Sequence, residues 1–228
     1  MSKIVFACEG ITEVNLIIKI LELREEFYFK LKRLNNSIDS AQNIGTYLEN
    51  NIYIANFQGV DNLKNFRKNF CKDRPLETDK LIFIVDADYY NDEKKNGGYE
   101  NRKISIENHI KIIKETLESE YGENELQFDY YITPDNKSDG MTEDICLKSI
   151  QCQKIVKYVD TEAIPAVLKT GEANIKNRAK SAFMMVSATQ DPLKGSSHLF
   201  IDNCFKLFNQ ETPEFQQIKE FIFKNLSL

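Results

Sequence analysis

The sequence predicts an α/β fold in which a mainly parallel β-sheet is flanked by helices and followed by a C-terminal helical annex. Two observations carry this prediction. Apolar runs of strand length alternate with segments of helical periodicity in the first half of the chain. From Met141 onward strand-like runs become scarce and successive helices follow. We therefore expect an α/β core over residues 1–150 and a helical extension over residues 151–228, packed together as one compact unit.

The first two βα units are expected within residues 3–70. Residues 3–8 form an apolar run of strand length, and Thr12 is the expected N-cap of the helix that follows. That helix carries four apolar residues at helical spacing, namely Val14, Ile17, Ile18 and Leu21. A second strand is expected over residues 52–57, and Asp61 is the expected N-cap of the next helix. One face of this helix is apolar through Leu63, Phe66 and Phe70.

The third unit contains the most apolar strand of the chain. Residues 81–85 are continuously apolar, as expected for a central strand that is covered on both faces. The polar loop at 91–98 has too few apolar groups to pack and is expected to move or to shield a site. A helix over 104–120 and a strand over 128–133 complete the core. The expected helices of the remaining chain cover residues 141–150, 152–168, 174–189 and 214–225.

Composition restricts the class of protein. The chain has 228 residues, 42% of them hydrophobic and 29% charged, which is typical of a globular protein and not of a disordered one. No apolar stretch approaches the roughly 20 residues that cross a bilayer, so we expect neither membrane insertion nor export. The five cysteines are odd in number, and no pair has zinc-ligand spacing. Reduced thiols in the cytoplasm are the expectation.

The net charge of −5 does not indicate a nucleic-acid-binding protein as a whole, so a polyanionic partner must be bound locally. Two basic groups are candidates for local contacts. Each is equally typical of a solvated helix face, which is the simpler interpretation. The first group is Lys64, Arg67, Lys68, Lys72 and Arg74, and the second is Lys169, Lys176, Arg178 and Lys180.

Carboxylates follow two of the expected strands at the point where each strand ends. Glu9-Gly10 follows the first strand, and Asp86-Ala87-Asp88 follows the strand at 81–85. If these strands are parallel neighbours, Glu9, Asp86 and Asp88 converge at one edge of the sheet, which is where open α/β sheets bind ligands. Taken singly, the aspartates are also typical of turns and helix caps, and Gly10 of a tight turn.

The first of these junctions and one further junction add acids at the same edge. Glu13 lies in the first turn of the first helix, and Glu143 and Asp144 follow the strand at 128–133. In isolation each is equally typical of an acid that complements a helix dipole. Converging carboxylates repel one another unless a cation lies between them, and hard oxygen donors suit Mg²⁺, or alternatively Mn²⁺. The sequence therefore predicts a divalent-metal site.

The order of these motifs resembles the Toprim superfamily, in which Glu-Gly follows the first strand and Asp-x-Asp a later one. Gln58-Gly59-Val60-Asp61-Asn62-Leu63 and Pro134-Asp135-Asn136, with Gly140 and Glu143-Asp144, are similar to a small standalone prokaryotic branch related to the overcoming-lysogenization-defect nucleases. The resemblance is strong to about Ile150 and looser through Lys180. It implies a Toprim-like, Rossmann-like fold and Mg²⁺-dependent phosphodiester chemistry.

The resemblance also implies roles for individual residues. Glu9 would be the general acid/base or a metal ligand, Asp86 and Asp88 would be metal ligands, and Lys180 would resemble a lysine that stabilises the transition state. Glu13 and either Glu143 or Asp144 would be ligands of a second ion. Two departures stand out: Glu13 occupies a position where related nucleases commonly have Asp, and Tyr89-Tyr90 follows the Asp-x-Asp in place of small residues.

The leading hypothesis is thus a Mg²⁺-dependent nuclease-like or related phosphoryl-transfer protein that acts on nucleic acid. The alternative is a regulatory module that binds a metal or a nucleotide on the same fold without turnover. A phosphatase with a covalent aspartate also uses Asp-x-Asp after an apolar strand, but that motif lies here on a later strand. A sugar-nucleotide transferase could use Asp-x-Asp as well, yet it would leave Glu9 and Glu143 unexplained.

Overall fold

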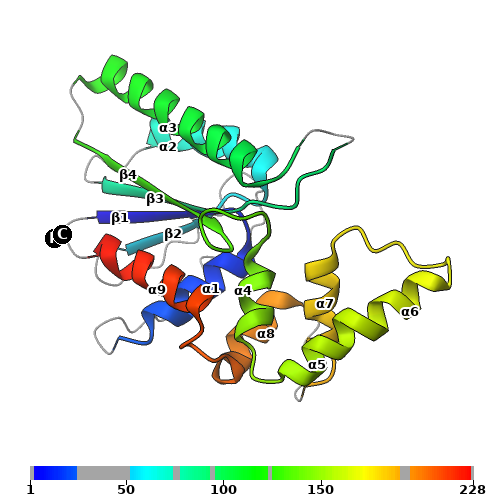
Figure 1. Ribbon diagram of the computed structural model, residues 1–228. Coiled ribbons are helices and arrows are strands. Elements are labelled where there is room, and N and C mark those ends of the chain that lie inside the picture. The colour runs from blue at the N-terminus through cyan, green and yellow to red at the C-terminus, as the bar shows by residue number, and fades with distance from the viewer. Residues whose placement is uncertain are drawn as a thin grey trace, which may run out of the picture.

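One parallel four-stranded sheet forms the centre of the protein in a computed structural model, which describes residues 3–24, 52–73, 78–92, 96–122, 125–190 and 196–226. The strands lie in the order β2, β1, β3, β4 (Figure 1). Their bounds are Lys3–Cys8 for β1, Ile52–Asn56 for β2, Thr78–Asp86 for β3 and Gln127–Thr133 for β4. The predicted α/β class with a parallel sheet is confirmed.

The two apolar strands occupy the middle of the sheet. β1 pairs with β2 on one side and with β3 on the other, and Cys8 is in register with Ile84. β3 begins at Thr78, before the apolar run at 81–85, because its first residues pair with the start of β1. Since both strands are buried on two faces, their apolar runs are continuous.

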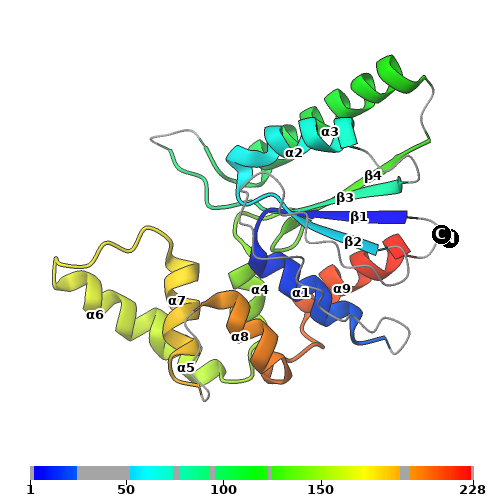
Figure 2. The same ribbon diagram turned by 180° about the vertical axis from the view of Figure 1, so that it is seen from behind.

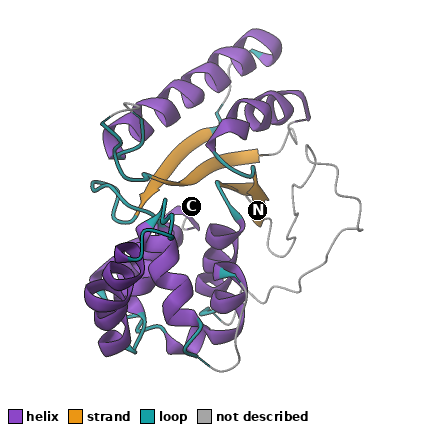
Figure 3. Cartoon of the chain, turned by 90° about the vertical axis from the view of Figure 1, so that its right-hand side faces the viewer, coloured by secondary structure: helices purple, strands orange, loops and turns teal. Residues whose placement is uncertain are grey.

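Two layers of helices cover the sheet (Figure 3). Helices α1 (Ile11–Leu21) and α9 (Pro213–Leu226) pack on one face, where Phe6 and Ile84 are buried. Helices α2 (Leu63–Asp73) and α3 (Tyr99–Tyr121) pack on the other face, where Phe83 is buried. Successive strand residues alternate between these two cores because side chains of a strand point to opposite faces.

Both predicted N-caps are wrong. α1 begins at Ile11 with Gly10 as its N-cap, so Thr12 is the second residue of the helix. Asp61 lies inside a 3₁₀ turn, Val60–Asn62, that precedes α2. In both places the chain enters the helix from an extended or left-handed glycine, and backbone groups make the first turn without a side-chain cap. α3 also begins earlier than predicted, at Tyr99 instead of residue 104.

The annex consists of helices around a third apolar core (Figure 2). α4 (Thr142–Ser149) leads from the sheet into α5 (Gln153–Tyr158), a π-helical segment (Val159–Ala163) and α6 (Ile164–Lys169), which together run close to the predicted 152–168. α7 (Arg178–Ser187) and α8 (Ser197–Cys204) complete the annex. α8 was not predicted, because eight residues are too few to show helical periodicity.

Phe183, Phe200 and Phe208 pack together in the annex core, and α8 contacts α1, so the annex is joined to the core domain through side chains. The last helix, α9, returns to the sheet. No helix within the described ranges is both long enough and apolar enough to cross a membrane. Arg74, a member of the first basic group, lies outside the described residues.

Candidate functional site

The adjacency of β1 and β3 brings the two acidic motifs together at the carboxyl edge of the sheet. The backbone N–H of Glu9 donates to the carbonyl of Ile84 over 3.0 Å and extends the ladder by one residue. The side chain of Glu9 turns back toward the neighbouring strand, where its Oε2 accepts the backbone N–H of Asp86 at 3.1 Å. The conditional prediction that the strands are parallel neighbours is thus confirmed.

A cavity of about 370 Å³ lies at this edge, beside the ends of β1, β2 and β3. Four of the predicted carboxylates line it together with one predicted cation; they are Glu9, Glu13, Asp86, Glu143 and Lys180. Among the described lining residues, Lys180 is the one basic side chain. We call this hollow the acidic cavity. Four carboxylates against one ammonium group leave it with an excess of negative charge.

Asp86 is the most firmly held of the four carboxylates. Its Oδ1 accepts three hydrogen bonds, from the hydroxyl of Thr133 at 2.7 Å and from the hydroxyl and backbone N–H of Thr142 at 3.0 and 2.9 Å. Thr133 ends β4 and Thr142 begins α4, so the two neighbouring elements position one oxygen of Asp86. Because these bonds all reach Oδ1, the carboxylate has a fixed orientation while Oδ2 accepts no hydrogen bond within the described part of the chain.

Glu13 explains the glycine of the Glu9-Gly10 pair. Gly10 has φ −141°, an extended conformation that any residue can adopt, so it does not serve the tight turn that the sequence suggested. A Cβ atom at Gly10 would instead lie 2.9 Å from Oε2 of Glu13. Glu13 is only 3% exposed and has little room to move. A Cβ atom at Gly10 would therefore displace the end of the Glu13 side chain, and glycine leaves room for that buried carboxylate.

Glu143 carries an unpartnered oxygen. The residue is 2% exposed, and its Oε2 is buried without a hydrogen-bond partner. Such an acceptor costs about 1–3 kcal/mol, and more when it is charged, unless a proton or an external ligand satisfies it. Within the described residues, the only other buried side-chain atom in this condition is Oγ1 of Thr78, which lies at the start of β3, away from the cavity.

Burial dominates the protonation of these acids. Loss of solvent raises the pKa of Glu9 to about 7, an effect that Arg102 opposes and the charges of Asp86 and Asp88 reinforce. Burial and then the charge of Asp86 raise the pKa of Glu143 to about 7. The pKa of Glu13 is raised well above its usual range by burial and by Asp86. In the metal-free protein the cavity therefore holds protons at neutral pH.

The pKa of Lys180 responds to the negative charge of the same carboxylates. It follows Asn177, whose side chain accepts the backbone N–H of Lys180 at 2.9 Å and caps the start of α7. Partial burial by itself lowers the pKa of the ammonium group, but the negative charges of Glu143 and Asp86 outweigh burial, so the pKa is raised. The annex thus contributes a permanently charged cation to a cavity whose carboxylates come from the core and from α4.

Arg102 is a central residue of the site that the sequence analysis missed. It is 6% exposed in the first turn of α3, and its Nε donates to the backbone carbonyl of Asp86 at 2.6 Å. Its guanidinium also lies 2.9 Å from Oδ2 of Asp88 and 3.9 Å from Oε2 of Glu9. Asp88 has φ +59°, a conformation that aspartate tolerates better than most residues, and this directs it toward Arg102.

Asp144 lies apart from the acidic cavity. Its Oδ2 accepts the backbone N–H of Met141 at 2.9 Å as the N3 residue of α4, and its Oδ1 accepts the hydroxyl of Tyr89 at 2.7 Å. The side chains of Asp144 and Tyr89 line a second, larger cleft, which Asp88 also lines. The described geometry thus places Glu143 and Asp144 in different hollows because consecutive helical residues point about 100° apart.

The donor set of the acidic cavity fits a hard divalent cation. Carboxylate oxygens are the ligands that Mg²⁺ and Mn²⁺ prefer, and one buried acceptor lacks a partner. Within the described ranges, however, no group of three or more His, Cys, Asp or Glu side chains is already arranged tightly enough to hold an ion. Side-chain movement would therefore have to accompany metal binding.

Comparison with known proteins gives a family but no activity. No curated protein and no solved structure matches the chain. One family model matches residues 3–227, and its description is "Protein of unknown function (DUF3226)". The match covers the α/β core, the acidic cavity and the annex together. The chain therefore belongs to the DUF3226 family of proteins of unknown function.

Proposed function

We propose that this protein is a divalent-metal-dependent, nuclease-like phosphodiesterase of the Toprim type that acts on nucleic acid. The observation that carries the proposal is the unpartnered, buried Oε2 of Glu143 in a cavity that four carboxylates share. A fold does not keep an unsatisfied carboxylate among other acids for stability, because both burial and repulsion oppose it. The order of Glu9-Gly10 and Asp86-Ala87-Asp88 on neighbouring strands supports the Toprim assignment.

Glu9, Glu13, Asp86 and Glu143 would hold the cation, with Asp88 at the margin. A bound Mg²⁺ or Mn²⁺ would polarise a phosphoryl oxygen and lower the pKa of a water molecule. Asp86 is suited to a fixed ligand position, since Thr133 and Thr142 orient its carboxylate. Asp144 is a weaker candidate because its two oxygens already accept hydrogen bonds.

The side chains of the cavity also provide proton transfer and charge stabilisation. Glu9 serves either as a ligand of the cation or as a general base, and for the second role its pKa of about 7 in the metal-free protein lies near the operating pH, where a general base works best. Lys180 supplies a cation that stays charged and can stabilise negative charge on a phosphate. Arg102 is paired with Asp88 and holds the strand ends in place, so it is a positioning residue.

The proposal is tested by incubating the purified protein with single- and double-stranded DNA and RNA in Mg²⁺, Mn²⁺ or EDTA. We expect cleavage only with a divalent ion, and Glu9→Gln and Asp86→Asn should reduce it at least a hundredfold. Glu118→Gln, an exposed substitution on α3, is the matched control and should cleave normally. Absence of cleavage on every substrate and with both ions would refute the enzymatic proposal.

A second candidate function is a non-catalytic module that binds a metal or a nucleotide. Arg102 favours it, since an internal cation already compensates Asp88 and Glu9 and allows the site to persist without turnover. Titration calorimetry with Mg²⁺ and nucleotides separates the two functions. Binding without product supports the module, whereas metal-dependent product formation supports the enzyme.

The cysteines support our proposal that the protein works in the reducing cytoplasm. No disulfide joins the five cysteines, all of which lie in the described ranges, and four of them, Cys8, Cys71, Cys146 and Cys204, are buried. Burial raises the pKa of Cys8 and of Cys146 well above the usual range, so both thiols stay protonated and unreactive. A secreted protein of this size would more often use its cysteines in disulfides.

A further inference from the structure

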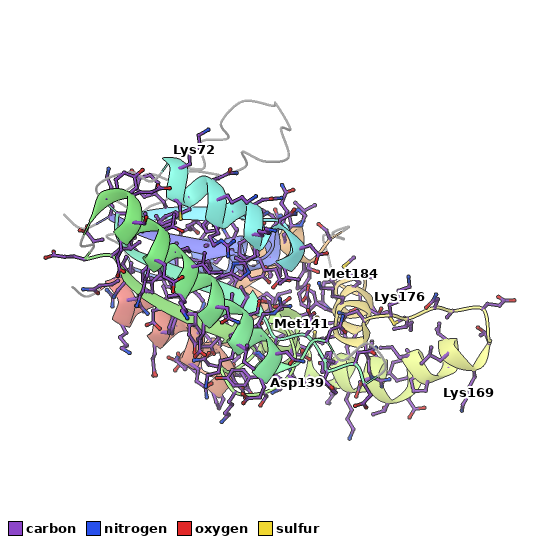
Figure 4. All side chains as sticks on the ribbon, turned by 90° about the horizontal axis from the view of Figure 1, so that it is seen from above. Lys72, Asp139, Met141, Lys169, Lys176 and Met184 are labelled. Atoms are coloured by element: carbon purple, nitrogen blue, oxygen red, sulfur yellow. The ribbon has the colours of Figure 1, made fainter. Side chains whose placement is uncertain are left out.

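A second cleft, of about 880 Å³, separates the α/β core from the annex. We call it the annex cleft. Its core wall includes Tyr89 and Asn96 of the loop after β3, and its annex wall includes Lys157 of α5 and Lys176 and Arg178 at the start of α7. Figure 4 shows Lys176 on the annex side and Asp139 and Met141 at the junction with the core.

The annex cleft and the acidic cavity are lined by neighbouring residues of the chain. Asp88 lines the cleft, and Asp86, two residues earlier, lines the cavity. On the opposite wall Arg178 and Ala179 line the cleft, and Lys180, the next residue, lines the cavity. The two hollows are thus lined by neighbouring residues on both walls, and the charge of Lys180 in the cavity acts on Asp88 in the cleft.

Three acidic and three basic side chains line the cleft, and two of the basic ones, both lysines, are available to a ligand. Each of its three acids already has a polar partner. Asp88 is paired with Arg102, Asp160 is paired with Arg178 at 2.7 Å, and Asp144 accepts the hydroxyl of Tyr89.

Lys157 and Lys176 are exposed and make no ion pair within the described residues. These two ammonium groups can therefore meet phosphates without first breaking an existing bond. The sequence left two interpretations for Lys176 and Arg178, a contact to a polyanion and a solvated helix face, and in the fold both exposed side chains line the cleft.

The core wall presents an aromatic ring. Tyr89 is 48% exposed, and its hydroxyl is tied to Asp144 over 2.7 Å, so the ring is held in place while much of its surface stays open. Burial and this hydrogen bond raise the pKa of Tyr89, so the phenol stays neutral. The apolar side chains of Leu147, Val156 and Ile175 also line the cleft. Aromatic and apolar surface next to cations is the composition of sites that stack bases and hold a backbone.

The core wall is braced. The carboxylate of Asp139 accepts the backbone N–H of Tyr90 at 3.1 Å and that of Tyr99 at 2.7 Å, one on each side of the loop. The backbone N–H of Gly140 donates to the carbonyl of Asp88 at 3.0 Å. The described parts of the loop are thus fastened to the segment after β4, and Tyr89 is presented on a preformed surface.

We propose that the annex cleft binds a single strand of nucleic acid, with Lys157 and Lys176 on the phosphates and Tyr89 stacked on a base, and leads the strand into the acidic cavity. This inference rests on the proposed function and adds its substrate class and the path of that substrate. A volume of 880 Å³ is that of a cube about 10 Å on a side, whereas the major groove of a duplex is by itself about 12 Å wide. A single strand therefore fits this hollow better than a duplex does.

Binding is measured by fluorescence anisotropy with a labelled 12-nucleotide single strand and with its 12-base-pair duplex. The titrations are run in EDTA, and also in Mg²⁺ on the Glu9→Gln background, so that cleavage plays no part. We expect Lys157→Ala/Lys176→Ala to weaken single-strand binding at least fivefold. The slope of log K against log salt should fall by about 1.4, at roughly 0.7 for each lost phosphate contact.

The control is Lys111→Ala/Lys224→Ala, which removes the same charge from exposed positions on α3 and α9 that belong to neither basic group. It should bind as the wild type does. Tyr89→Ala should weaken binding at least fivefold. Tyr89→Phe keeps the ring and should retain most of the affinity, which separates stacking from loss of the Asp144 hydrogen bond.

Equal affinities of the cleft and control lysine variants would overturn the inference, as would tighter binding of the duplex than of the single strand. These outcomes differ from failure of the proposed function. Loss of all cleavage with intact, lysine-dependent strand binding would refute the enzyme and leave the cleft assignment standing. Metal-dependent cleavage that is unchanged in the cleft lysine variant would support the enzyme and refute the cleft assignment.

Discussion

Replacing Glu9 by glutamine should stabilise the metal-free protein at alkaline pH. The side chain is 15% exposed, and burial raises its pKa from 4.5 to about 7. At 1.36 kcal/mol for each pKa unit, this rise corresponds to about 3 kcal/mol. That is the free energy that the folded state loses when Glu9 ionises, and glutamine, which carries no charge, does not lose it.

The sign of the pH dependence follows from proton binding. Below pH 4.5 both the folded and the unfolded states hold the proton, so Glu9 has no effect on stability. Between pH 4.5 and about 7 the folded state keeps a proton that the unfolded state releases, so the stability of the wild type falls as the pH rises. The advantage of Glu9→Gln should therefore grow from near zero at pH 4 to about 3 kcal/mol at pH 8.

The assay is thermal and urea unfolding in EDTA at pH 4, 6 and 8. For a chain of this size 1 kcal/mol shifts the Tm by about 2–4 °C, so the variant should melt roughly 6–12 °C higher at pH 8. Glu118→Gln, on the exposed face of α3, is the control and should follow the wild type. Parallel pH profiles for Glu9→Gln and the wild type would refute the reasoning. Saturating Mg²⁺ should stabilise the wild type more than the variant.

Three further predictions concern the same site. Affinity for Mg²⁺ should increase between pH 6 and 8, because Glu9 and Glu143 both have a pKa of about 7 and must lose their protons to bind the ion. The increase should be up to about tenfold per pH unit for each proton displaced. Calorimetry in buffers of different ionisation enthalpy counts these protons. Gly10→Ala should weaken Mg²⁺ binding in the same calorimetric assay, since its Cβ would displace Glu13, and unchanged affinity would contradict that role. Arg102→Met should destabilise the metal-free protein by about 1–3 kcal/mol in urea unfolding, because the buried carbonyl of Asp86 loses its donor. Part of the loss should be restored by Mg²⁺, since the substitution also leaves Asp88 unpaired, and equal stability with and without the ion would argue against this coupling.

The strands were predictable because their signal is local. β1 and β3 are buried on both faces, so their residues are apolar without interruption, and each run stops where the chain leaves the sheet. The acids at the ends of these strands could be identified for the same reason, because they directly follow the apolar runs. The helix caps were not predictable, since Gly10 and the 3₁₀ turn before α2 start their helices through backbone geometry that residue type does not indicate.

The partners of the acids depend on elements that are distant in sequence. Asp86 is held by Thr133 and Thr142, and Asp88 is held by Arg102, none of which belongs to a motif. An arginine in the first turn of a helix is ordinarily a surface residue, and nothing in its sequence neighbours indicates that α3 would bury it. Only the packing of α3 on the sheet decides that Arg102 compensates the strand-end carboxylates.

By itself the sequence determined a parallel α/β sheet with acids at three strand-to-helix junctions. Buried strands and helices alternate along the chain, and each can be identified from its local pattern of apolar residues. The tertiary structure alone decided which acids share a hollow. Strand order placed Glu9 beside Asp86, the rotation between consecutive helical residues sent Glu143 and Asp144 to different hollows, and the docking of α7 brought Lys180 to the cavity. These outcomes depend on contacts between distant segments, and the residue types involved are the same whether or not those contacts form.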